Sequence, residues 1–231
     1  MRAALLLALG SACAIPDQKL GAYACAGAPE PSTAPAEITV SGTVFDPFAT
    51  GGGGVQGLTV VAMPTGGFTT MTDTVGNFDG QISTGGTPSS DFLKITGSGF
   101  VDGYFYPAED VATALPIGPL EAYMPGELAM IGSGVGIPVG SDTEQLVISV
   151  EDCAGDSVEG ATITVDSGSV IYINQNQPDP TATMTDARGA AFVLGVTASP
   201  VTIAAMTPQQ GFHAHSVPVM PGTLTQTAIQ P

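Results

Sequence analysis

The chain has 231 residues, which is room for one large domain or for two of about 100 residues each. It has four Lys and Arg residues against 21 Asp and Glu residues, for a net charge of −17, so it lacks the clustered cations that bind nucleic acid or an anionic membrane surface. Hydrophobic residues make up 43% of the chain, which excludes disorder throughout, and frequent Gly and Pro among Val, Thr and Ile predict many short strands joined by turns.

Residues 1–12 have the three parts of a secretory signal peptide. Arg2 supplies the positive end, an apolar run follows from Ala3 to Gly10, and small residues precede Cys13. The apolar run is too short to span a bilayer. We therefore expect the protein to be exported.

The end of this segment, Leu9-Gly10-Ser11-Ala12-Cys13, resembles a bacterial lipobox, with Gly10 where that motif usually has Leu. The resemblance implies that Cys13 becomes the first mature residue and that an attached lipid holds the protein on the membrane. Ala14 stands where an inner-membrane retention signal usually has Asp, so the resemblance implies the outer membrane, on its periplasmic or its surface-facing side. Ordinary cleavage beside a cysteine that has another use remains the alternative, and the protein would then be secreted.

Residues 13–36 are rich in Pro and Ala and predict an extended tether. Because the chain has three cysteines, lipidation of one leaves Cys25 and Cys153 as an even pair in an oxidising compartment. We expect a disulfide between them, which would fasten the tether to the second half of the chain. Two unpaired thiols, or a packed Cys153, remain the alternative.

Two short phrases each occur twice in the same order, which predicts two copies of one β-module. Val55-Gln56-Gly57 corresponds to Val158-Glu159-Gly160, and Met71-Thr72-Asp73 corresponds to Met184-Thr185-Asp186. In each copy a Gly follows the Asp by three residues. This spacing predicts an Asx-turn closed by the Asp, with the Gly at positive φ.

We expect an all-β fold of two tandem Greek-key β-sandwiches, because short strands alternate with turn signals along both halves. The first module covers residues 37–107 and the second covers residues 143–231. The connecting segment 108–142 is broken by Pro and Gly, and we expect it to pack on the first module with a short helix over Leu120–Ile131. Since this segment is the least repeat-like part, it is the expected seat of a specific function.

The order of strand, glycine hairpin, Val-x-Gly strand and Thr-Asp-x-x-Gly turn resembles carboxypeptidase regulatory-like, transthyretin-like β-sandwich domains. Ile38–Phe78 and Leu146–Phe192 carry the resemblance. It implies a spacer, adhesion module or accessory domain on a secreted or surface protein, without catalysis. We therefore expect a structural or binding module at the cell envelope, with a carbohydrate or a protein as its partner.

The two histidines, His213 and His215, support a different hypothesis, a metal-dependent enzyme. Residues i and i+2 of a strand point to the same face, so on a predicted strand over 213–219 both imidazoles could bind one metal. Together with the turn at Asp186 they resemble the motif order of intradiol ring-cleavage dioxygenases, which share the sandwich fold. That family's iron also needs two tyrosinates, and the second module contains only Tyr172, so the resemblance implies an incomplete site. Surface histidines are the alternative.

Tyr104 and Tyr106 are predicted to lie on one face of a strand, where aromatic rings can stack on a sugar. This pair is the candidate carbohydrate-binding surface. Packing of the strand in a core or at an edge is the alternative.

The excess of acidic residues allows Ca²⁺ as a cofactor, since carboxylates and backbone carbonyls are the ligands that this ion prefers. No other cofactor is expected. A solvated, soluble surface is the alternative explanation of the acidity.

Overall fold

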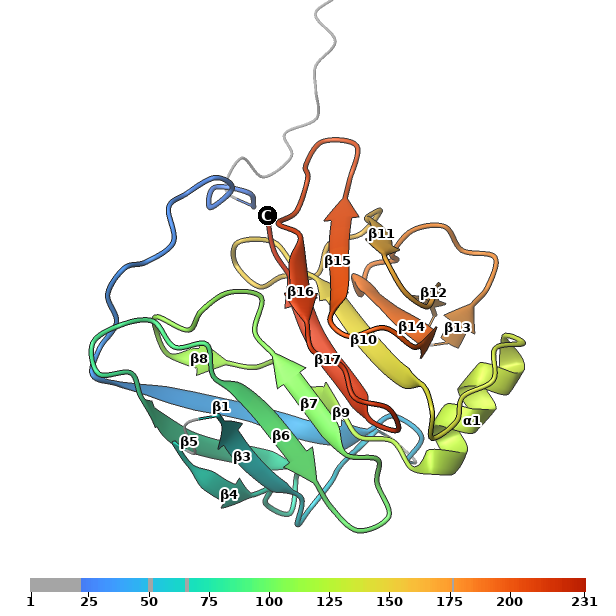
Figure 1. Cartoon of the computed structure of the whole chain (residues 1–231), viewed down its shortest axis with the longest axis horizontal. Coiled ribbons are helices and arrows are strands. Elements are labelled where there is room, and N and C mark those ends of the chain that lie inside the picture. The colour runs from blue at the N-terminus through green and yellow to red at the C-terminus, as the bar shows by residue number, and fades with distance from the viewer. Residues whose placement is uncertain (1–21, 50–51, 65–66, 176) are drawn as a thin grey trace, which may run out of the picture.

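The computed structural model describes residues 22–49, 52–64, 67–175 and 177–231 (Figure 1). These residues form 17 strands and one helix, so the predicted all-β fold is confirmed. None of the described residues forms a helix that is long and apolar enough to cross a membrane.

A central sheet of nine strands runs through both halves of the molecule. In spatial order its strands are β13 (Gln177–Asp179), β12 (Ser169–Asn174), β14 (Ala190–Val196), β10 (Glu144–Val150), β17 (Leu224–Ile229), β7 (Gly103–Tyr106), β6 (Phe92–Thr96), β3 (Thr59–Met63) and β4 (Thr69–Met71). The last strand of the chain, β17, pairs in parallel with both β10 and β7, and so joins the two halves in one sheet.

Two smaller sheets cover this central sheet. A five-stranded sheet of the first half contains β1 (Glu37–Asp46), β2 (Gly53–Gly54), β5 (Asn77–Ser83), β8 (Leu115–Pro116) and β9 (Leu120–Glu121). A three-stranded sheet of the second half contains β11 (Thr162–Val165), β15 (Val201–Met206) and β16 (His215–Val217). Each half is therefore a β-sandwich, as predicted.

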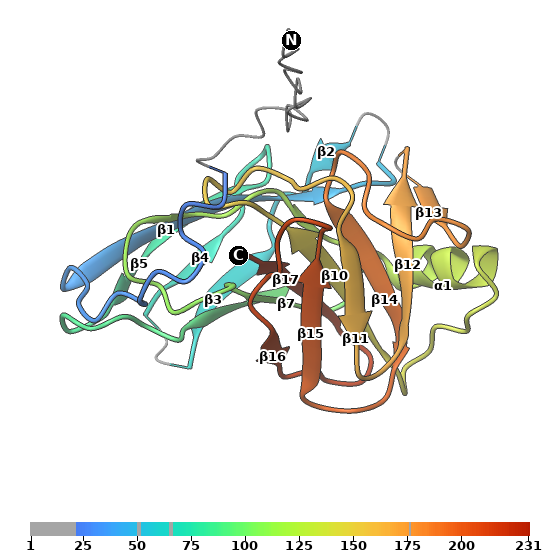
Figure 2. The same ribbon diagram turned by 90° about the horizontal axis from the view of Figure 1, so that it is seen from above.

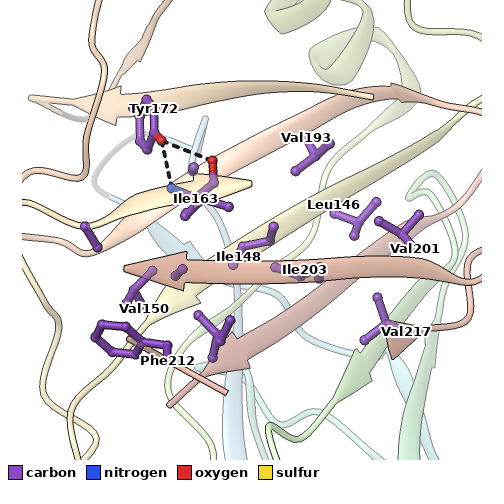
Figure 3. Close-up of a cluster of buried hydrophobic side chains, with 14 of the residues drawn as sticks. Leu146, Ile148, Val150, Ile163, Tyr172, Val193, Val201, Ile203, Phe212 and Val217 are labelled. Carbon is purple, nitrogen blue, oxygen red and sulfur yellow. Dashed lines mark hydrogen bonds between the residues drawn. The ribbon is translucent and has the colours of Figure 1, made fainter. Parts of the chain in front are cut away.

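The two small sheets pack on opposite faces of the central sheet (Figure 2). Phe105, Gln226 and Val147 are register partners on β7, β17 and β10, and register partners share a face. Phe105 belongs to the core under the five-stranded sheet, which marks that face in the first half. In the second half the three-stranded sheet packs against Leu146 and Ile148 instead, which point to the other face (Figure 3).

The repeated phrases build the same structure in both halves. The Thr72 hydroxyl accepts a hydrogen bond from the backbone N–H of Leu58 at 2.9 Å and donates one to the carbonyl of Val55 at 2.6 Å. The Thr185 hydroxyl does the same, accepting from the N–H of Ala161 at 2.9 Å and donating to the carbonyl of Val158 at 2.8 Å. Each threonine thereby holds its Asx-turn against the Val-x-Gly turn that precedes it in the sequence.

The glycines of the repeated turns have the predicted conformation, with φ of 83° at Gly76 and 66° at Gly189. A side chain at either position would collide with the facing backbone. A Cβ at Gly76 would lie 2.2 Å from the carbonyl oxygen of Val44, and one at Gly189 would lie 2.5 Å from that of Val150. The motif therefore needs glycine both for its φ and for the close approach of the chain.

The connecting segment contacts both halves, whereas we expected it to pack on the first module alone. Its short strands β8 and β9 pair with β1 in the first half. Its helix α1 (Pro125–Gly134) buries Leu128 and Ile131 against the central sheet of the second half. The helix begins later than the predicted Leu120 because residues 120–121 pair with β1 and because proline fits the first turn of a helix.

The described part of the expected tether, residues 22–36, lies along both halves. Cys25 and Cys153 are joined in a disulfide, with their Cα atoms 5.7 Å apart. The N–H of Cys153 also donates a hydrogen bond to the carbonyl of Ala22. Farther along, the N–H of Ala34 donates to the carbonyl of Gly86 in the first half. We call residues 22–36 the strap.

Candidate functional site

A groove of about 500 Å³ lies where the two halves meet, which is within the usual size range of small-ligand sites. One wall is the first part of the connecting segment, from Pro107 to Leu120, and the opposite wall is the turn Cys153–Gly155. The floor is formed by residues of β10 and β17 and by those that follow these strands: Val147, Ser149, Glu151, Gln226, Thr227, Ala228 and Gln230. Phe105 of β7 also lines the groove, so both halves and the connecting segment contribute to it.

The Gln226 side chain fixes the connecting segment on the groove floor. Its Oε1 accepts a hydrogen bond from the backbone N–H of Glu121 at 2.7 Å, and its Nε2 donates one to the carbonyl of the same residue at 2.9 Å. Gln226 is 5% exposed, so its amide is shielded from solvent, and the backbone of Glu121 is partly buried. The side-chain amide of Gln226 thus supplies the backbone hydrogen bonds of Glu121 that a neighbouring strand would otherwise make.

His215 makes a second connection at the groove. Its Nδ1 lies 3.0 Å from the carbonyl oxygen of Ala108, and its Nε2 lies 3.0 Å from the hydroxyl of Thr227. Since a carbonyl only accepts hydrogen bonds, Nδ1 carries a hydrogen here. The Thr227 hydroxyl lies 2.8 Å from the carbonyl of Tyr106 as well, so this network links β16, β17 and β7.

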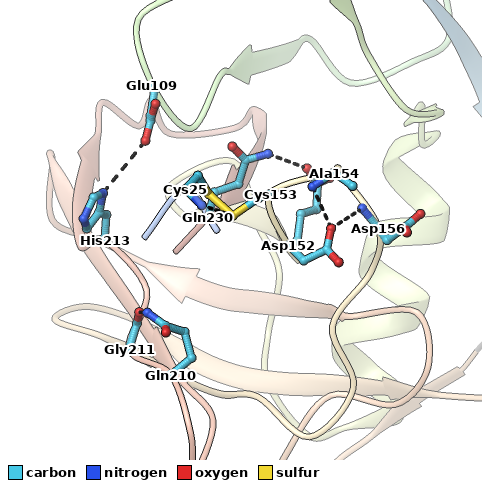
Figure 4. The surroundings of a disulfide bond; sticks show 11 residues. Cys25, Glu109, Asp152, Cys153, Ala154, Asp156, Gln210, Gly211, His213 and Gln230 are labelled. Carbon is cyan, nitrogen blue, oxygen red and sulfur yellow. Dashed lines mark hydrogen bonds and ion pairs between the residues drawn. A yellow bond between two sulfur atoms is a disulfide. The ribbon is translucent and has the colours of Figure 1, made fainter. Parts of the chain in front are cut away.

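His213 and His215 have separate partners and do not form the predicted metal pair. Strand β16 is shorter than the predicted strand over 213–219. The backbone N–H of His213 donates a hydrogen bond to the carbonyl of Gln230, so His213 lies outside the strand. The exposed His213 ring faces Glu109, with Nδ1 3.8 Å from Oε1 (Figure 4). Both ring nitrogens of His215 are hydrogen-bonded.

The other residues of the dioxygenase-like pattern do not complete a metal site. Tyr172 is 5% exposed and lies in the core between the three-stranded sheet and the central sheet, where its hydroxyl accepts a hydrogen bond from the N–H of Ile163 at 2.9 Å (Figure 3). In the part of the chain that the structure describes, no group of three or more His, Cys, Asp or Glu side chains is arranged to hold a metal ion. The described donors thus do not fit the iron of that family, and they form no carboxylate cluster for Ca²⁺.

The predicted aromatic pair is rearranged. Tyr104 is 8% exposed, which is too little for stacking on a sugar. Tyr106 stacks on Phe92 instead, with ring centroids 4.7 Å apart and planes inclined by 25°. The ammonium of Lys94 lies 5.7 Å from the centre of the Tyr104 ring and 3.6 Å from the Asp102 carboxylate. On this face of β6 and β7, opposite to the groove, the partly exposed aromatic pair is therefore Phe92 with Tyr106.

The disulfide borders the groove through Cys153, and Figure 4 shows its surroundings. The Asp152 carboxylate orders the turn at Cys153, since it accepts hydrogen bonds from the N–H groups of Ala154 at 2.8 Å and Asp156 at 3.1 Å. Beside it, the Gln230 amide donates to the Glu151 carboxylate at 3.2 Å. Burial raises the pKa of Glu151, and the bond from Gln230 opposes this rise.

Glu144, at the start of β10, is a buried polar residue whose role no sequence pattern indicates. It is 1% exposed, and its Oε2 accepts hydrogen bonds from the N–H of Met220 at 3.1 Å and from the hydroxyl of Thr223 at 2.7 Å. Burial raises the pKa of this carboxyl to about 7, against the hydrogen bonds from Thr223 and Met220, which lower it.

A signal for these polar contacts is present in the sequence of β17. All six of its residues are buried, and three of them are the polar residues Thr225, Gln226 and Thr227. Polar side chains in a strand that is covered on both faces need partners, so this strand indicates a buried network. Cys13, the predicted lipidation site, lies outside the described residues, as does the rest of the signal segment.

No protein-family model and no curated protein matches the chain. Among solved structures, the chain is similar to one from the type II cohesin–X-dockerin complex of Acetivibrio cellulolyticus, with 18% identity over 38% of this chain and 58% of that one and a TM-score of 0.30. The TIE protein of Bacillus anthracis is similar at 13% identity over 84% of this chain and 34% of that one, with a TM-score of 0.26. The shaft pilin SpaA of Lactobacillus rhamnosus GG is similar at 12% identity over 87% of this chain and 98% of that one, with a TM-score of 0.26. This chain thus spans less than two thirds of the first two, and similarity of this degree assigns no family or activity.

Proposed function

We propose that this protein is a cell-envelope lipoprotein, anchored through Cys13, that acts as a structural or binding module and holds a protein or carbohydrate partner in the groove between its halves. The observation that carries the proposal is the construction of the groove. Its lining comes from both halves and from the connecting segment, and the pair of hydrogen bonds between Gln226 and Glu121 keeps one wall in place. A site held this rigidly avoids part of the entropic cost of binding.

The anchor is tested separately from the groove. The full chain and its Cys13→Ser variant are expressed in a bacterial host and followed by membrane fractionation and intact mass. The proposal expects lipid mass and membrane association in the parent protein, and loss of both in the variant. An unlipidated, fully soluble parent would contradict the anchor and leave the groove untouched.

The groove is tested with the purified mature protein on glycan arrays and by crosslinking to envelope proteins. Ser149→Arg places a long side chain on the groove floor, and Ser98→Arg makes the same change in an exposed turn of the first half. We expect the first variant alone to lose the partner that the parent protein binds. Equal binding by the parent and both variants would place the partner elsewhere.

A further inference from the structure

The parallel strands β10, β17 and β7 lie side by side where the two halves meet and begin at the same end of the sheet. One turn is hydrogen-bonded to the starts of these strands. The turn 220–223 leads into β17, and the N–H of its Gly222 donates a hydrogen bond to the carbonyl of Thr143, just before β10. At the start of β17, the N–H of Leu224 donates to the carbonyl of Asp102, just before β7. Glu144 binds both ends of this turn through Met220 and Thr223. Its carboxyl therefore fastens the strand that joins the halves.

This carboxyl is buried without a cation. In the described ranges the ion pairs are Lys94 with Asp102 and His213 with Glu109, and neither includes Glu144. Its Oε1 has no hydrogen-bond partner, and neither has the hydroxyl of Thr225, which is 0% exposed and lies beside it. The Thr225 hydroxyl can serve either form, as a donor to a carboxylate or as an acceptor from a neutral carboxyl. An ionised carboxyl that is buried without a cation is costly, and this burial favours the neutral form.

The ionisable groups around Glu144 are few. Strands β14 and β17 and the segment 218–223 contain none. Strand β7 contributes Tyr104 and Tyr106, and the pKa of Tyr106 is raised to about 12, chiefly by burial and then by the neighbouring charges of Tyr104 and Glu144. Asp142 precedes the strand and accepts a hydrogen bond from Ser141, and His215 is held by Ala108 and Thr227. None of these supplies a compensating positive charge at the carboxyl.

We propose that the protonation state of Glu144 controls how firmly the two halves are held together: the neutral carboxyl holds the turn 220–223 on β10 and β17, and loss of its proton loosens that turn. The inference does not depend on the lipid anchor or on a ligand in the groove. It assigns a regulatory role to a residue that lies on the face of the sheet opposite to the groove.

The sign of the pH dependence follows from burial. The pKa of Glu144 is about 7 in the folded protein, against an ordinary value of 4.5. The stabilisation of the turn by the neutral carboxyl is therefore fully present below about pH 4.5 and is lost as the pH rises through about 7. The equilibrium constant for opening the turn is then expected to rise by a factor on the order of tens between about pH 5 and pH 8.

Hydrogen exchange measured by mass spectrometry, corrected for the intrinsic pH dependence of exchange, tests this inference on peptides that cover residues 218–224. In the parent protein we expect protection to fall by a factor on the order of tens from about pH 5 to pH 8. In Glu144→Gln, whose side chain is neutral and can also donate to Thr225, we expect protection that is independent of pH and higher than that of the parent at pH 8. In Thr225→Val, which removes the acceptor, we expect reduced protection at pH 5.

Glu159→Gln is the matched control, since it makes the same change at an exposed position of the second half. It should keep the pH dependence of the parent protein. The inference is overturned if Glu144→Gln keeps that pH dependence too, or if residues 218–224 of the parent are equally protected at both pH values. Failure of Glu144→Gln to fold would leave the parent's own pH profile and Thr225→Val to decide.

Discussion

Thr72 and Thr185 are structural equivalents, one in each half, and each hydroxyl bridges an N–H and a carbonyl of the Val-x-Gly turn that precedes it. Both side chains are buried, at 3% and 2% exposure. The two halves are therefore related by a shared polar contact, in addition to their shared hydrophobic pattern.

Replacing either hydroxyl with a methyl group is expected to destabilise the protein. In Thr72→Val or Thr185→Val a buried N–H and a carbonyl lose their partner, so we expect the free energy of unfolding to fall by about 1–3 kcal/mol in each variant. Chemical denaturation measures this change. Thr164→Val, at an exposed position of β11, is the control and should change the stability by less than about 0.5 kcal/mol. A similar small change in the buried variants would show that these bonds contribute little.

The glycines of the two Asp-x-x-Gly turns can be distinguished from other glycines at positive φ, such as Gly57 of the Val-x-Gly turn. Gly76→Ala should cost about 3 kcal/mol or more, because the left-handed conformation is strained and the new Cβ meets the carbonyl of Val44. Gly57→Ala has a similar φ, 81°, with no atom within 4 Å of the new Cβ, and should cost only about 1 kcal/mol. Equal melting temperatures for the two variants would contradict the steric part of this argument.

The bond between Gln226 and the backbone of Glu121 is expected to be important for the joint. Gln226→Leu keeps the approximate volume of the side chain and leaves both backbone groups of Glu121 without a partner, so we expect a loss of about 2–4 kcal/mol. Denaturation gives the magnitude, and hydrogen exchange should show the loosening at residues 115–123. The exposed Gln209→Leu is the control. If stability falls with unchanged exchange over 115–123, the amide does not hold this wall.

Asp179 offers a test of local electrostatics at the edge strand β13. The Thr181 hydroxyl, at 2.6 Å, and the Asn174 amide, at 3.1 Å, donate to its carboxylate and lower its pKa to about 2. Because the folded value is depressed, the stabilisation is present above the ordinary value and is lost as the pH falls through the folded pKa. We expect Thr181→Ala to raise the pKa toward 3.8, as followed by carboxyl NMR, and Thr183→Ala to leave it in place.

The parts of the fold that are determined locally could be predicted from the sequence. The Asp-x-x-Gly spacing specifies a turn within a few residues, so the two β-modules and their positive-φ glycines were accessible from the repeated phrases. The pairing of β17 with β7 was not accessible, because it joins residues such as Thr225 and Tyr104 that lie far apart in the chain. No local pattern marks such a contact, apart from the polar residues of β17.

The candidate site shows the same division. Spacing alone places His213 and His215 on one strand face, but the bond from His213 to Gln230 takes the first of them out of the sheet. Alternation alone places Tyr104 and Tyr106 together, but burial removes Tyr104 from the surface. In both cases the side chain's role is decided by tertiary partners that the neighbouring sequence does not contain.

The disulfide also determines how the molecule transmits tension. A pull applied to the chain before Cys25 and resisted at the C-terminus passes through the sulfur atoms to Cys153 and then along the rest of the second half. The whole first half lies inside the covalent loop that these cysteines close, 128 residues apart, and is excluded from this path. Its sandwich therefore lies outside the covalent path of that force, and reduction of the disulfide would place it in that path.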